Sequence, residues 1–298
     1  MRKLSSFNGV YVLIFVTFVT SFANTVAHAD TTCGPNSNAT AHTGAGNAAN
    51  NQNTYCFATP QVLQMKFYEF GLCDGTADPA NRSNCTALFK DTNGKDVNLS
   101  TGRVSDLVDG VTITEGTYSH GYLIISNAIE LNLTIEFSVD RTDDDGDTGK
   151  VCYTDGRKIS TDANDIAYPG DTGNSIISCG AQSNAVNSKE TIALNGCGVG
   201  YTSSYPNYQY SAKGVTVTTD LYVVKSDGTQ SNGCANDHGF FAVQPFQTPV
   251  SITADTAGLD VGISLTGAVS LGFTANNANT AAPNDVMFNG LQFIISSN

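Results

Sequence analysis

Residues Ile129–Val139, with the sequence IELNLTIEFSV, decide the fold class of this chain. The odd-numbered positions are all apolar, whereas the even-numbered positions are Glu, Asn, Thr, Glu and Ser. This period of two is typical of a β-strand with one buried side, because a helix would scatter the same apolar residues around its circumference. The apolar stretch Gly121–Ser126 precedes it, and Ser126-Asn127-Ala128 predicts a tight turn between two antiparallel strands.

The rest of the chain shows similar strand patterns and no sustained helical period. Its 29 glycines, together with abundant Asn, Thr and Ser, favour turns and strands over helices. We therefore predict an all-β protein, an antiparallel β-sandwich with long polar loops and disulfides. The expected strands lie at 62–73, 121–126, 129–139, 190–194, 214–225, 239–243, 249–254, 259–274 and 285–296. The last of them would carry a bulge at Asn289-Gly290 and is a candidate donor strand for another copy.

Residues 1–29 are typical of a secretory signal peptide. Arg2 and Lys3 are followed by an apolar run at 10–22, and Ala27-His28-Ala29 offers small residues for cleavage. We expect a secreted, periplasmic or cell-surface protein with no membrane span after cleavage. Residues 30–59 read as a low-complexity loop tethered by cysteines, and 60–298 as the β-sandwich, in one body or in two lobes at 60–140 and 190–298.

All eight cysteines follow the predicted leader, so an oxidising compartment favours disulfides between them. Eight cysteines allow 105 pairings, and our hypothesis joins nearest neighbours around loops rich in Gly, Asn, Ser or Asp. The expected pairs are Cys33–Cys56, Cys73–Cys85, Cys152–Cys179 and Cys197–Cys234.

The charge of the chain excludes some partners. Its formal net charge is −13, which loss of Arg2 and Lys3 makes −15, and no basic stripe occurs. Nucleic acid is not an expected partner, because nothing would displace counterions from phosphates. An anionic membrane surface is not an expected partner for the same reason.

Two segments are candidate binding sites. Asp143, Asp145 and Asp147 alternate around Gly146, and such Asp-rich loops can supply oxygen ligands to calcium. The alternative is a solvated loop that needs no cofactor. The second candidate is a tyrosine cluster whose rings could stack on sugars, or else pack over the edge of the sandwich. This cluster comprises Tyr201, Tyr205, Tyr208 and Tyr210.

No catalytic motif stands out. The chain has no Gly-x-Ser-x-Gly elbow. Glu130 and Glu136 would lie about 20 Å apart along one strand, too far for a glycosidase pair. We therefore do not expect an enzyme, although a secreted hydrolase without a recognisable motif remains a third hypothesis.

The sequence EGTYSH at 115–120 leads into an apolar strand, and FGLC at 70–73 ends an earlier strand in a cysteine. In these features residues 60–140 resemble exported bacterial β-sandwich domains of unknown function that carry a Gly-Thr-Tyr-x-His turn-strand motif. The resemblance implies an envelope-associated protein and carries over no catalytic residue. Many members of that family are lipoproteins, and this chain lacks the small apolar residues expected before a lipid-modified cysteine.

The expected function is that of an exported, non-enzymatic structural or adhesive protein of the cell envelope. Its expected partner is either another copy of itself, in a homo-oligomer or fibre, or a surface glycan. The alternative is an extracellular binding module for glycan or calcium.

Overall fold

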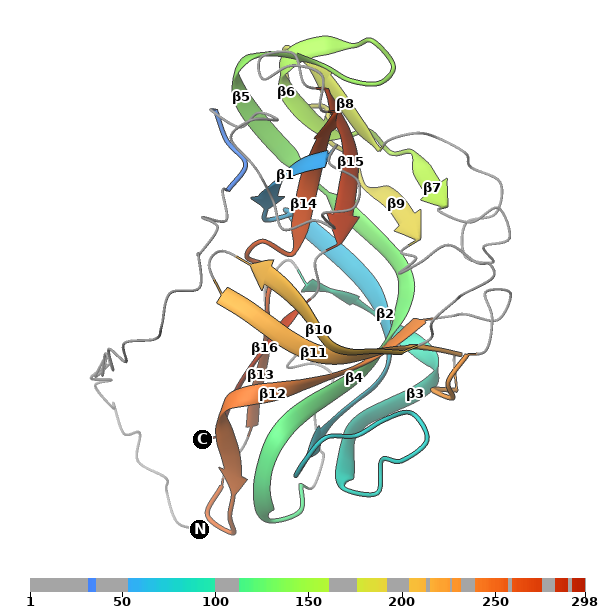
Figure 1. The fold of residues 1–298 in the computed structure, drawn as a ribbon, viewed down its shortest axis with the longest axis vertical. Coiled ribbons are helices and arrows are strands. Elements are labelled where there is room, and N and C mark those ends of the chain that lie inside the picture. The colour runs from blue at the N-terminus through green and yellow to red at the C-terminus, as the bar shows by residue number, and fades with distance from the viewer. Residues whose placement is uncertain are drawn as a thin grey trace, which may run out of the picture.

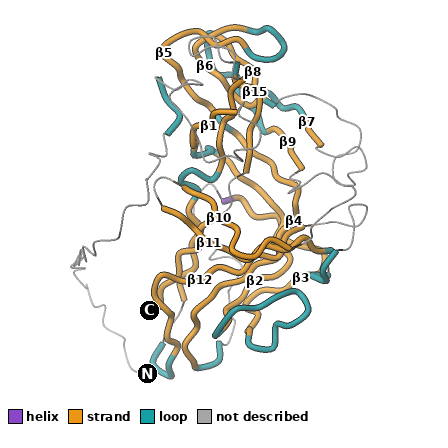
Figure 2. Tube along the Cα trace, in the orientation of Figure 1, coloured by secondary structure: helices purple, strands orange, loops and turns teal. Residues whose placement is uncertain are grey.

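The protein is built from β-strands. The computed structural model describes residues 32–35, 53–99, 113–160, 176–191, 204–212, 215–225, 227–231, 239–256, 259–274, 282–288 and 291–297. The sixteen elements of these ranges are all strands. Strands, in orange, make up most of the described trace in Figure 2. They are β1 (Asn53–Ala58), β2 (Val62–Cys73), β3 (Cys85–Asn98), β4 (Gly116–Asn132), β5 (Thr134–Thr142), β6 (Thr148–Thr154), β7 (Lys158–Ser160), β8 (Ile177–Gly180), β9 (Ser188–Thr191), β10 (Ser204–Ala212), β11 (Val215–Val224), β12 (Gly239–Ile252), β13 (Leu259–Ser264), β14 (Val269–Thr274), β15 (Pro283–Phe288) and β16 (Gln292–Ser297).

Strand β4 organises the largest sheet, which has eight strands (Figure 1). The main path runs β10-β11-β12-β4-β2-β3, and β9 joins β4 beyond the end of β12, with β7 beside β9. All neighbours are antiparallel except β7 and β9. The sheet combines strands from both 60–140 and 190–298, so these two segments share one hydrogen-bonded structure.

The predicted turn at Ser126-Asn127-Ala128 is wrong, because these residues lie inside β4. The Ser126 hydroxyl accepts a hydrogen bond from the Ala128 amide at 3.0 Å, and the pairing with β2 shifts register here. The site is a bulge, which uses the same local Ser and Asn chemistry as a turn without reversing the chain. On the far side of the bulge β4 exchanges β12 for β9 as its partner.

The stretch 129–139 crosses from the large sheet into another one. Leu133 lies between β4 and β5, and the odd-numbered residues from Ile129 to Phe137 are all buried as their period predicts. Val139 departs from the pattern, since the residue is 44% exposed.

Three smaller sheets accompany the large one, in the orders β5-β6-β8, β1-β14-β15 and β13-β16. One cluster of buried residues joins them to the inner face of the large sheet, which carries Leu123 and Ile125. Because β15 pairs with β14 and β16 pairs with β13, the prediction of a single bulged strand over 285–296 is wrong. Asn289-Gly290, where the alternation of apolar residues changes parity, lies between β15 and β16, and these two strands belong to different sheets.

Three of the four expected cysteine pairs are disulfides: Cys33–Cys56, Cys73–Cys85 and Cys152–Cys179. The second and third join residues that lie directly opposite each other on adjacent strands. Disulfides persist in oxidising compartments, so these bonds indicate an extracellular or periplasmic environment. Cys197 and Cys234 lie outside the described residues.

The segment 30–59 is not a loop throughout, because residues 53–58 form β1 and pair with β14. The predicted leader at 1–29 lies outside the described residues. Within the described residues no helix has the length and hydrophobicity to cross a membrane.

Candidate functional site

Strands β11 and β12 separate along their length, and this separation opens a cavity on the inner face of the large sheet. They pair from Val224 opposite Gly239 as far as Asp220 opposite Val243. At that point the Thr219 hydroxyl donates a hydrogen bond to the Val243 carbonyl at 2.9 Å. From there β11 continues beside β10, whereas β12 continues beside β4.

A long bulge in β12 widens the gap. Pairing with β4 stops at Pro245, opposite His120, and resumes at Val250, opposite Tyr118. Between these two pairs, β12 has four unpaired residues and β4 has one. Proline has no amide hydrogen to donate, and Pro245 and Pro249 bracket the unpaired segment. The placement of these two prolines accounts for the bulge.

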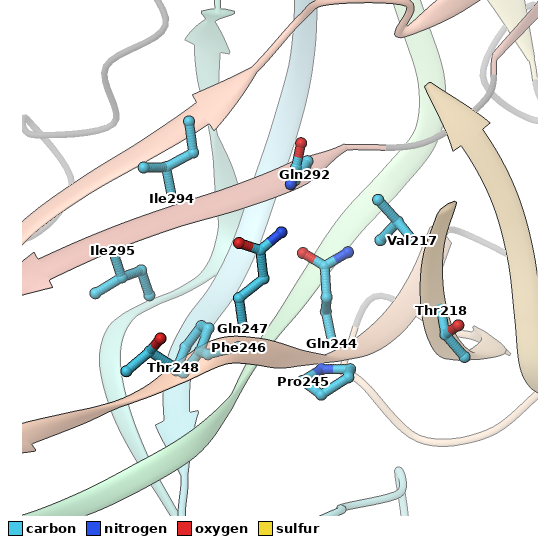
Figure 3. Close-up of a pocket in the computed structure, with 10 residues that line it drawn as sticks. All are labelled: Val217, Thr218, Gln244, Pro245, Phe246, Gln247, Thr248, Gln292, Ile294 and Ile295. Carbon is cyan, nitrogen blue, oxygen red and sulfur yellow. The ribbon is translucent and has the colours of Figure 1, made fainter. Parts of the chain in front are cut away.

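The cavity has a volume of about 450 Å³ and opens to solvent. Strands β11 and β12 form two of its walls, and β16 of the two-stranded sheet forms the third (Figure 3). The side-chain amides of Gln244 and Gln247 extend from β12 toward β16, where Gln292 lies. No lining residue is charged. The full lining comprises Val217, Thr218, Gln244, Pro245, Phe246, Gln247, Thr248, Gln292, Ile294 and Ile295.

Tyr208 of the tyrosine cluster lies on the same face of the sheet as this cavity. Tyr208 lies opposite Thr219, two residues along β11 from Val217 of the cavity wall. Paired residues and residues two apart on a strand share a face, so Tyr208 and the cavity belong to the same face of the sheet. Tyr210 lies opposite Val217, and Tyr201 is outside the described residues.

A bulge in β10 positions Tyr208. The register shifts between Tyr205 and Tyr208, Asn207 has a positive φ of 53°, and its amide donates to the Asp220 carboxylate at 2.8 Å. The rings of Tyr205 and Tyr208 meet edge to face, with centroids 6.4 Å apart. Burial, and secondarily the neighbouring Tyr205, raises the pKa of Tyr208, although 36% of its surface is exposed.

The acidic loop is organised by contacts within the chain. One oxygen of the buried Asp143 accepts hydrogen bonds from the amides of Asp145 and Asp147 at 3.0 and 2.9 Å. The other oxygen accepts from the Cys179 amide at 2.8 Å, beside the Cys152–Cys179 disulfide. Asp143 thus closes the loop onto β8, and the described residues hold no group of three or more His, Cys, Asp or Glu side chains arranged for a metal ion.

Arg157 connects the same loop to the body of the protein. It forms ion pairs with Asp145 and Asp155, and its Nε donates to Asp155 at 2.6 Å. Burial by itself would raise the pKa of Asp155, but hydrogen bonds from Arg157 and Ser178 hold that pKa below its ordinary value. The carboxylates of Asp143 and Asp145 are therefore directed at internal partners.

The outer face of the large sheet holds a charged cluster that sequence reasoning did not find. Glu69 is 6% exposed; it accepts a hydrogen bond from the Tyr122 hydroxyl at 2.7 Å and pairs with Arg82 at 3.1 Å and Lys90 at 2.9 Å. Burial and the contact with Glu69 raise the pKa of Tyr122. Gly71 makes room for this ring, because a Cβ there would lie 2.5 Å from Cε1 of Tyr122.

The three cavity glutamines were also missed. The sequence predicts two strands, at 239–243 and 249–254. The residues between them, QPFQT at 244–248, belong to β12 and line the cavity. A strand interrupted by proline and rich in amides was the available signal. The contribution of Gln292 depends on the packing of β16 against β12, which no local pattern predicts.

A scan against protein-family models, a search of curated proteins and a search of solved structures found no match. The resemblance to exported bacterial β-sandwich domains therefore stays a prediction, and the function has to be argued from geometry.

Proposed function

We propose that this chain is an exported, non-enzymatic adhesive protein of the cell envelope. Its scaffold would be a β-sandwich whose large sheet presents a recognition surface along the flank formed by β10, β11 and β12. The observation that carries the proposal is the exposed Tyr208, held by a bulge on the same face of the sheet as an open, uncharged cavity.

The sandwich part of the proposal is supported by the composition of the core. Inner-face residues of the large sheet share one buried cluster with residues of all three smaller sheets. Two layers packed through a common apolar interior are typical of sandwiches. Members of the cluster from the smaller sheets include Phe137 of β5, Ile263 of β13 and Leu271 of β14.

Export is supported by three disulfides, by the predicted leader and by the acidic composition. Each disulfide bond would stabilise the fold by about 2–4 kcal/mol, which suits a protein that works outside the cell.

The tyrosines suit recognition because their positions are fixed. Tyrosine offers a large rigid ring with a polar tip and loses little conformational entropy on binding, so it is common in recognition surfaces. Tyr208 is supported by Tyr205 and by the hydrogen bond from Asn207 to Asp220.

Adhesion is favoured over self-assembly by the edges of the large sheet. Open edges invite other strands, and bulges, charges and prolines protect them. The edge strand β10 carries Pro206 at its bulge, and a second edge strand, β3, carries Lys90 and Lys95 on either side of a register shift near Gly94. Neither of these two long edge strands is a straight, uncharged template.

The proposal is tested with beads coated with protein secreted from the full-length gene, on surfaces coated with a panel of polysaccharides. We expect wild-type beads to adhere and Tyr208→Ala beads to adhere several-fold less. Val139→Ala, which shortens an exposed apolar side chain on β5, is the control and should leave adhesion unchanged. Failure of wild-type beads on every surface, or filaments in electron micrographs of the unbound protein, would overturn the adhesive function.

A further inference from the structure

We infer that the cavity between β11, β12 and β16 is a binding site for a neutral saccharide. The inference deepens the proposed function and rests on it in one respect, since it names the ligand class for the same flank of the sheet. The cavity volume of about 450 Å³ lies within the range of small-ligand sites, which is about 300–1,000 Å³.

The polar lining matches hydroxyl groups. Gln244, Gln247 and Gln292 each carry an amide with two donors and one acceptor, and the hydroxyls of Thr218 and Thr248 both donate and accept. A sugar offers closely spaced hydroxyls that also donate and accept. The exposed Gln247 and the half-buried Gln292, on two different strands, can therefore bond several hydroxyls of one ring.

The lining disfavours charged ligands. An ion that leaves water for a site of neutral amides loses solvation and gains no opposite charge in return. A net charge of −13 also repels anions from the whole surface. The expected ligands are neutral hexoses and N-acetylhexosamines rather than uronic or sialic acids.

The apolar lining suits the other side of a sugar. Val217, the half-buried Phe246 and Ile295 supply carbon surface on β11, β12 and β16. Sugar rings present C–H faces that pack on such surfaces while their edges form hydrogen bonds. A saccharide longer than the cavity could continue toward Tyr208, which lies on the same face.

The rigidity of the lining contributes as well. Gln244 is only 5% exposed, and its strand is tied to β4 on one side of the bulge and to β4 again beyond it. Side chains held by strands lose less conformational freedom on binding than side chains on loops.

The test is an array of neutral and acidic oligosaccharides probed with the full secreted protein and with three variants. We expect wild type to bind neutral glycans selectively. Gln247→Leu and Gln292→Leu should each weaken binding about tenfold, the effect of losing about 1.4 kcal/mol. Gln182→Leu, at an exposed position after β8, is the matched control and should bind as wild type does.

The outcomes separate this inference from the proposed function. If neutral glycans bind and Gln247→Leu and Gln292→Leu bind as wild type does, the saccharide site is elsewhere and the inference is wrong, while adhesion stands. A preference for acidic glycans would also overturn the inference alone. So would adhesion of the beads by a protein that binds no glycan on the array. Absence of both adhesion and glycan binding would overturn both.

Discussion

The two faces of the large sheet differ in how far their polar side chains are enclosed by partners. On the outer face, Glu69 is enclosed by Tyr122, Arg82 and Lys90. On the inner face, where β11 and β12 separate, the exposed Gln247 lines a cavity that is open to solvent. The buried charged group stabilises the fold, whereas the exposed neutral amide is accessible from solvent.

This difference extends to the acidic loop. Asp143 and Asp145 attract attention in the sequence because carboxylates can bind calcium, yet their oxygens contact backbone amides and Arg157. A carboxylate buried without partners is costly, so in this chain the buried carboxylates have internal partners. The carboxylates of Glu69, Asp143 and Asp145 therefore stabilise the fold. A recognition surface is better sought among neutral side chains.

The largest expected effect comes from Glu69→Ala. The substitution leaves the Tyr122 hydroxyl and the Arg82 guanidinium without their shared acceptor, so we expect a loss of about 3 kcal/mol in the free energy of unfolding. Urea denaturation measures it. Lys90→Ala is the comparison, because the Lys90 side chain is 57% exposed and its ion pair should contribute less than about 1 kcal/mol. Equal losses in the two variants would contradict the enclosed role of Glu69.

Asp143→Ala should have the next largest effect. Three backbone amides lose their acceptor, which we expect to cost about 2 kcal/mol of unfolding free energy. Asp147→Ala, at an exposed position, is the control and should cost little. We also expect millimolar calcium to leave the melting temperature of the wild type unchanged, and a clear rise would show that the loop binds the ion after all.

The smallest of these effects concerns Asp155 and depends on pH. Because the pKa of Asp155 lies below its ordinary value in the folded protein, its contribution to stability is complete above that ordinary value and is lost as the pH falls through the folded value. We expect Asp155→Asn to cost about 1 kcal/mol at pH 7, with the difference from wild type shrinking below about pH 4. Denaturation across this range checks it, and a pH-independent difference would exclude the ion pair with Arg157 as its cause.

The sequence predicts the local features of the fold well. The period of two identifies strand residues over 129–139 and their buried side as far as Phe137, and nearest-neighbour pairing of the cysteines predicts the three disulfides that are present. It does not predict which strands pair. Ser126-Asn127-Ala128 could be a turn or a bulge, and only contacts with β2, β9 and β12 decide between them.

The candidate site is less predictable for the same reason. Pro245 and Pro249 indicate where β12 leaves the ladder, but the cavity also requires β16, which is far along the chain. Tyr205 and Tyr208 were found from composition because they cluster in sequence. The glutamines come together only through the packing of two sheets.

The central claim is that the open neutral flank recognises a ligand while the enclosed charged cluster only stabilises the fold. The most direct test compares Gln247→Leu and Glu69→Gln on the oligosaccharide array, with the unfolding free energy of each variant measured in parallel. The account predicts that Gln247→Leu keeps its stability within about 0.5 kcal/mol and loses binding, because its side chain is exposed. Glu69→Gln should lose stability and, while folded, bind as wild type does. Binding that survives in Gln247→Leu and disappears in folded Glu69→Gln would contradict it.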